Sequence, residues 1–131
     1  MRINKSIDIE NEIRTALSGY LTAYCRPLPA DYDLPNILIT LVGGTDSQTI
    51  DTFEVVLDSR AQTEADALDY LNTATGILKQ VAKEQTSALR HIVVNSSGSW
   101  GSDPVRPDLS MCSARLAIVA HQEITEVDNN V

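Results

Sequence analysis

Aromatic residues and cysteines are scarce in this sequence. Only 5% of the residues are Phe, Trp or Tyr although 43% are hydrophobic, so we expect an aliphatic core built from Leu, Ile, Val and Ala. The two cysteines, Cys25 and Cys112, stand far apart and lack the spacing of a metal site or a redox motif. They are expected to be free, mostly buried thiols of a protein made in a reducing compartment.

Long hydrophobic runs and clusters of positive charge are also missing. No stretch approaches the roughly 18 apolar residues of a membrane span, and Met1 to Asp8 lacks the apolar segment of a signal peptide. The formal net charge is -8, and between Asp46 and Asp69 there are seven acids and one base. This acidic stretch argues against a grip on nucleic acid, because contacts to phosphate need clustered Lys and Arg. It is compatible with a surface past which DNA moves without sticking, or simply with a solvated face.

The spacing of apolar residues predicts a single α+β domain. Helices are expected over 8–24 and 64–84, and strands over 36–42, 49–58, 89–95 and 111–124. The order α-β-β-α-β-β gives a four-stranded, mainly antiparallel sheet with two helices packed on one face. The first two strands form a hairpin whose loop is too long for a tight turn. The single domain covers 1–131, with an ordered core over about 8–124 and a flexible tail over 125–131.

No residue pattern typical of catalysis or metal binding is present. His91 and His121 fall on separate predicted strands without further ligands at a readable spacing. The Gly43-Gly44-Thr45 turn lacks the following Lys of a phosphate-binding loop. Glu54 and Asp58 share a strand face and could pair as acid and base, although such pairs are more often solvated. We expect no catalytic residue, no cofactor and no metal.

The irregular segment 96–108 is the first candidate interface. It holds the only Trp, Trp100, followed by the run Asp103-Pro104-Val105-Arg106-Pro107-Asp108. Prolines restrict the backbone before docking, and Trp and Arg often anchor interfaces. The candidate contact residues are Trp100, Asp103, Arg106 and Asp108. In the alternative, Trp100 packs onto the domain's own core and Arg106 pairs with Asp103 or Asp108.

The end of the second predicted strand is the other candidate. Asp58 and Arg60 lie there, just before the second predicted helix. They are either partner contacts or an intramolecular ion pair, which contributes little if exposed.

Several segments together resemble minor tail proteins of long-tailed phages of Gram-positive bacteria. They are Val42-Gly43-Gly44, the run FEVVLDSRA from Phe53 to Ala61, the run GSWGSDPVRPD from Gly98 to Asp108, and Cys112-Ser113-Ala114-Arg115-Leu116. The likeness spans about residues 8 to 123, and the element order is similar to the tail terminator and tail-to-head joining family.

The resemblance implies a structural role without catalysis. Subunits of that family form a six-membered ring that caps the tail tube and offers a docking face to the head. The implied partners are copies of the chain, the tail tube protein and a head-side neck protein, with DNA only passing through the ring and no membrane. The implied location is the neck of the virion, after synthesis in the host cytoplasm.

Two other functions remain open from the sequence. The chain could be a head-side neck or head-completion protein, or a non-viral interaction module that docks a peptide along a sheet edge. An enzyme using Glu54 and Asp58 is the weakest hypothesis. A non-viral interaction module would be a monomer or dimer and would be absent from virus particles.

Overall fold

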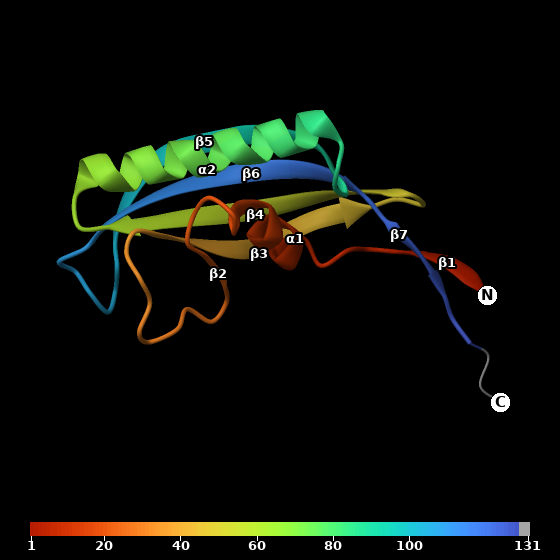
Figure 1. Ribbon diagram of the computed structural model, residues 1–131, viewed down its shortest axis with the longest axis horizontal. Coiled ribbons are helices and arrows are strands. Elements are labelled where there is room, and N and C mark those ends of the chain that lie inside the picture. Colours follow the sequence, from red (N-terminus) through yellow and green to blue (C-terminus); the bar gives the residue numbers. More distant parts are fainter. Residues whose placement is uncertain (129–131) are drawn as a thin grey trace.

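The computed structural model describes residues 1–128 as two helices and two β-sheets (Figure 1). The elements, in chain order, are β1 Arg2–Lys5, α1 Ile9–Leu17, β2 Ala23–Cys25, β3 Asn36–Asp46, β4 Ile50–Ala61, α2 Glu64–Glu84, β5 Leu89–Ser102, β6 Ser110–His121 and β7 Glu123–Glu126. The predicted α+β class is confirmed. The prediction of a flexible tail over 125–131 is partly wrong, because β7 reaches Glu126. Residues 129–131 of the predicted tail lie outside the described part of the chain.

The main sheet has five strands rather than the four predicted. Its order is β2-β3-β4-β6-β5, and every neighbouring pair is antiparallel except β2 and β3, which are parallel. The sheet is therefore mixed. A separate two-stranded ribbon of β1 and β7 leaves the body at the end where the two termini lie (Figure 1).

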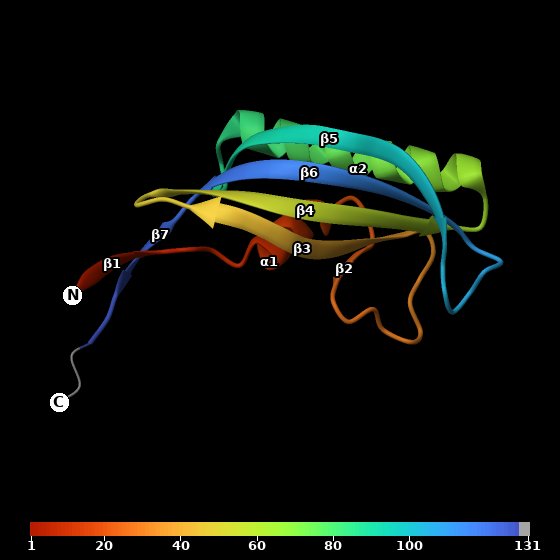
Figure 2. The same cartoon turned by 180° about the vertical axis from the view of Figure 1, so that it is seen from behind.

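Both helices cover the same face of the main sheet. Figure 2, seen from behind, shows the strands in front of α1 and α2. The buried cluster joins residues of both helices to the inward side chains of the strands, and it is aliphatic as predicted. Its largest members are Ile9, Ile13, Leu17, Ile37, Ile39, Leu57, Leu71, Leu78, Leu89, Leu116 and Ile118. The opposite sheet face carries no helix within residues 1–128.

Helix α2 confirms the predicted bounds of 64–84. The Thr63 hydroxyl accepts a hydrogen bond from the backbone N–H of Asp66 (3.2 Å), which satisfies one of the free donors at the helix start. Gln85 ends the helix in the left-handed conformation (φ 57°), and its N–H bonds back to the carbonyl of Val81.

The first helix is much shorter than the predicted 8–24. It ends at Leu17, and Ser18 and Gly19 begin a turn that leaves Tyr20 75% exposed. Ser and Gly are weak helix formers, so the apolar stripe beyond them does not extend the helix. The chain instead forms β2, whose backbone pairs with β3 from Ile37 to Ile39.

Strands β3 and β4 form the predicted antiparallel hairpin, but its loop is short. β3 continues to Asp46 and β4 begins at Ile50, so only residues 47–49 connect them. A bulge between Leu41 and Gly43 lets the ladder continue through the glycines that the sequence assigned to a turn.

The segment predicted as an irregular loop over 96–108 is mostly strand. β5 runs to Ser102 against β6, and three shifts of register absorb the irregular spacing. Gly98, at one of these shifts, has φ +79°, a conformation that favours glycine. Similarly, the predicted strand 111–124 is divided at Gln122, whose side chain bonds to the carbonyl of Ser47 and to Asp51.

Candidate functional site: the loop end of the sheet

Two proline-bearing loops meet at the end of the sheet opposite the termini (Figures 1 and 2). One loop spans 26–35, between β2 and β3, and the other spans 103–109, between β5 and β6. Arg60, near the end of β4, is the strand residue that lies between them. We call this region the loop end. It brings together Arg60, Asp103, Arg106 and Asp108 of the predicted contact residues.

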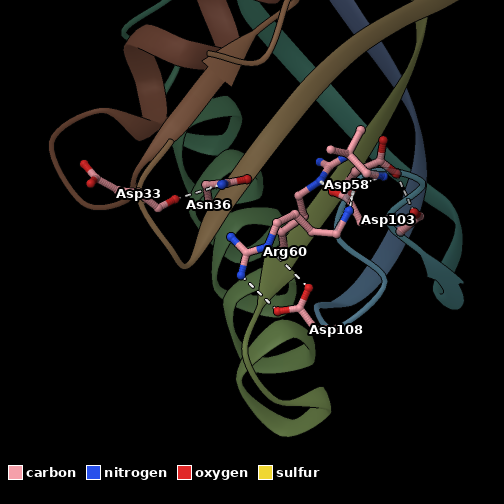
Figure 3. Close-up of polar contacts among 9 residues, drawn as sticks. Asp33, Asn36, Asp58, Arg60, Asp103 and Asp108 are labelled. Atoms are coloured by element: carbon pink, nitrogen blue, oxygen red, sulfur yellow. Dashed lines mark hydrogen bonds and ion pairs between the residues drawn. The ribbon is translucent and has the colours of Figure 1, made fainter. Parts of the chain in front are cut away.

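A buried ion pair joins the strand to the second loop. The Nε of Arg60 donates to Oδ2 of Asp103 (2.7 Å), and the two side chains are only 9% and 5% exposed. The other carboxylate oxygen of Asp103 accepts the backbone N–H groups of Val105 (2.8 Å) and Arg106 (3.0 Å). Both oxygens of Asp103 are thus engaged, and the loop is fixed to β4 (Figure 3).

These contacts set the pKa of Asp103. Burial raises the pKa of the carboxyl, but hydrogen bonds from Arg60 and from the backbone of Arg106 and Val105, together with the charge of Arg60, lower it more. The net effect is a pKa below the usual value for Asp, so the carboxyl is held in its charged form.

A second pair lies on the surface of the same loop. Arg106 donates to both oxygens of Asp108, with Nε–Oδ1 of 3.3 Å and Nη2–Oδ2 of 2.9 Å. The hydrogen bond and charge of Arg106 lower the pKa of Asp108. One alternative left open by the sequence, an Arg106–Asp108 pair, is therefore the one observed. The loop is not a basic patch, because each of its charges has an opposite partner.

Asp58 and Arg60 do not pair with each other. Asp58 accepts a hydrogen bond from the Ser113 hydroxyl on the neighbouring strand β6. Arg60 instead forms its ion pair with Asp103, which lies in the loop between β5 and β6. The residues next to Arg60 in the sequence do not predict this partner.

Trp100 lies on β5, the outer strand of the sheet, directly opposite Cys112 of β6. It is 49% exposed, so it is not part of the fully buried core, and about half of its side chain is covered by the domain itself. Burial raises the pKa of the Cys112 thiol, and Cys112 and Cys25 are both free.

The acidic stretch from Asp46 to Asp69 does not form one patch. Asp51 is buried (2% exposed), Glu54 pairs with Arg115 on the open sheet face (2.7 Å), and the last three acids lie on α2. Charge alone therefore does not define a docking surface here.

Sequence reasoning missed the role of the first loop. Asn36 holds it through a hydrogen bond to the carbonyl of Asp33 (2.8 Å; Figure 3), and the Tyr24 hydroxyl accepts the Asp33 N–H (3.1 Å). Tyr32 of this loop lines a cavity of about 340 Å³ shared with Arg60 and the second loop. The segment that shares this cavity, 103–109, is distant from it in sequence, so local patterns do not predict the contact.

Other chemistry is limited in the part of the chain that the structure describes. Within residues 1–128, no three His, Cys, Asp or Glu side chains are grouped so as to hold a metal ion. Among the same residues, neither helix is long and apolar enough to cross a membrane. No protein-family model and no curated protein matches the chain.

Proposed function

We propose that this chain is a structural subunit of a long-tailed phage, which forms a ring that terminates the tail tube and joins it to the head. The ring is a hexamer in this proposal, and its other contacts are the tail tube protein and a head-side neck protein. The chain performs no catalysis, and DNA passes through the ring without a specific grip. The resemblance of the sequence supports the phage assignment.

One structural observation supports ring formation: the main sheet has two unlike open edges. On one side β5 has no partner along its outer edge among residues 1–128, and from Ile92 to Ser102 it has no charge and no proline. On the other side β2 covers β3 only from Ile37 to Ile39, so Thr40 to Asp46 has no outer strand within the described residues, and of this stretch the Leu41 N–H donates to Oε2 of Glu10 on α1 (2.9 Å). Open edges are templates for pairing with another chain.

The directions of the strands fit a ring built from unlike contacts. β3 and β5 run in opposite directions, because each of the three pairs that link them is antiparallel. Copies related by rotation about an axis along the strands would therefore set β5 antiparallel to the next copy's β3. Contacts between two different patches close into rings when the rotation closes.

The test combines mass in solution with composition of particles. We expect the 14.3 kDa chain to form closed rings at high concentration, and purified phage particles to contain it at the neck. A Ser97→Lys variant places a charge on the exposed β5 edge and should prevent ring formation. Asn72→Lys adds the same charge on an exposed position of α2 and should not.

Two outcomes would contradict the proposed function, and a third would contradict the proposed contact. A chain that stays a monomer or dimer and is absent from particles would favour a non-viral interaction module. A chain found in particles on the head side of the neck would favour a head-completion protein. Equal assembly of the two Lys variants would exclude the β5 edge as the contact.

A further inference from the structure

A basic groove lies beside the open β5 edge of the main sheet. It has a volume of about 320 Å³ and is formed between the C-terminal part of α2 and the start of β5. Its lining residues are Lys79, Ala82, Lys83, Arg90, His91 and Ile92. The sequence shows no run of positive charge, but the packing of α2 on β5 brings these bases together.

The positive charges of the groove have no acidic partner in the described chain. Among residues 1–128, no ion pair involves Lys79, Lys83 or Arg90. The Arg90 guanidinium donates to the backbone carbonyls of Ser87 and Leu89, which are polar but carry no net charge. These contacts hold the guanidinium in place without neutralising it.

Two acids form hydrogen bonds close to the groove without lining it. Glu84 accepts from the side chain of Gln80 (3.1 Å), and Glu12 of α1 accepts from the N–H of Ala88 (3.4 Å). Even with both acids counted, three positive charges stand against two negative charges. The groove therefore keeps an excess of positive charge in a chain whose net charge is -8, which favours an acidic partner.

The other open edge carries negative charge on the same side of the sheet. Asp46, the last residue of β3, lies directly opposite Asp51 of β4, and residues so paired point to one face. Asp51 shares its face with Val55, two pairs of residues along the strand, and Val55 is buried under the helices. Asp46 therefore points to the helix-covered side, on which Lys79 and Lys83 also lie.

The charge of Asp46 is exposed and has no basic partner among residues 1–128. Like charges directly opposite each other on neighbouring strands are destabilising, and Asp46 forms no ion pair that would offset this. A cavity of about 230 Å³ that both carboxylates line contains no Lys, Arg or His. A base that approaches Asp46 from outside the chain would reduce the repulsion.

The directions of the strands bring the groove and Asp46 together in a ring. The start of β5 and the end of β3 lie at the same end of the sheet (Figures 1 and 2). When β5 pairs antiparallel with the next copy's β3, its start therefore lies beside the end of that strand. We propose that the basic groove of one copy binds the Asp46 carboxylate of the next copy, which fixes the register of the contact. This contact rests on the ring of the proposed function.

The experiment reverses the charges separately and together. Lys79→Glu, Lys83→Glu and Asp46→Lys should each raise the concentration at which half of the chains are assembled by about tenfold, because each variant sets like charges against each other. Assembly is measured by sedimentation. Combining Asp46→Lys with the more harmful of the two Lys variants keeps the net charge at -8 and should restore assembly.

General repulsion between copies predicts the opposite result for one variant. Asp46→Lys brings the net charge two units nearer to zero, so it would assemble more readily if overall charge controlled assembly. Asn72→Lys adds positive charge at an exposed position of α2 outside the groove and should not weaken assembly. The melting temperature of each variant checks its fold.

The proposed contact and the proposed function fail in different ways. If the unaltered chain forms rings but the folded single variants assemble equally well, or the combined variant does not recover, the groove does not bind Asp46, while the ring itself stands. If the unaltered chain stays a monomer at every concentration and is absent from particles, the proposed function is wrong and this contact with it.

Discussion

At the scale of single residues, the Arg60–Asp103 pair is the strongest polar constraint on the loop end. Removing one member of a buried pair leaves the other charge uncompensated, which typically costs about 3 kcal/mol or more. We expect Asp103→Asn to lower the free energy of unfolding by about this amount, measured by urea denaturation. Asp108→Asn disrupts the exposed pair of the same loop and is the matched control, with an unchanged midpoint. Equal urea midpoints for Asp103→Asn and Asp108→Asn would contradict the conclusion that the buried pair stabilises the fold more than the exposed pair.

The same pair predicts a pH dependence of stability. The folded pKa of Asp103 lies below its usual value of about 3.9, so its stabilisation is complete above that value and is lost as the pH falls through the folded pKa. The difference in unfolding free energy between the unaltered chain and Asp103→Asn should be constant from about pH 7 to pH 5 and shrink below about pH 4. A difference that grows on acidification would show that the carboxyl is neutral when folded.

The residues of the loop end could be predicted from the sequence individually but not as a site. The alternation of charge and proline from Asp103 to Asp108 identified the loop, and the Arg106–Asp108 pair was one of the stated alternatives. The partner of Arg60, Asp103, lies 43 positions away in the sequence, and Tyr32, which lines the same cavity, comes from the loop before β3. Contacts of this range depend on how strands are ordered in the sheet, which local periodicity does not specify.

At the scale of elements, the sequence predicted the structure correctly where all the local features of a segment favoured the same element. Helix α2 has a cap, a continuous apolar stripe and no early break, and its bounds were predicted correctly. The apolar stripe that predicted the first helix continues past Ser18 and Gly19, but α1 ends before them. The chain after these two residues forms β2, because its backbone pairs with β3. In β5, the Gly- and Ser-rich composition suggested a loop, but pairing with β6 satisfies the backbone and bulges absorb the irregularity.

The terminal ribbon of β1 and β7 is the least supported element of the fold. Ile124 of this ribbon is 64% exposed, and among residues 1–128 its one side-chain hydrogen bond to the body is donated by Asn4 to the carbonyl of Gln48 (2.8 Å). Isolated two-stranded ribbons are marginally stable in water. Hydrogen exchange of the free chain should therefore be much faster in β1 and β7 than in β4 and β6, the central strands. Equal protection would show that the ribbon is held by contacts beyond its own pairing.

At the scale of the whole molecule, the decisive question is whether Trp100 supports the fold or the assembly. It is half exposed on the outer strand β5, within the uncharged edge that the proposed ring uses. A Trp buried at the centre of an interface typically contributes about 2 kcal/mol or more to binding. We therefore expect Trp100→Ala to keep the melting temperature of the monomer and to abolish ring formation and tail joining.

Leu68→Ala is the control for this experiment, because Leu68 is a large hydrophobic residue that is 37% exposed on helix α2 and belongs to neither edge strand of the main sheet. It should leave both melting and assembly unchanged. If Trp100→Ala unfolds the monomer, the indole ring stabilises the sheet, and the surface contact is made by other residues. If the variant folds and still joins tails to heads, the β5 edge around Trp100 is not the contact, and a ring would have to be held by the open sheet face or the loop end. Measuring the melting temperature and tail joining on both variants separates these outcomes, because only loss of joining with an intact fold assigns Trp100 to the interface.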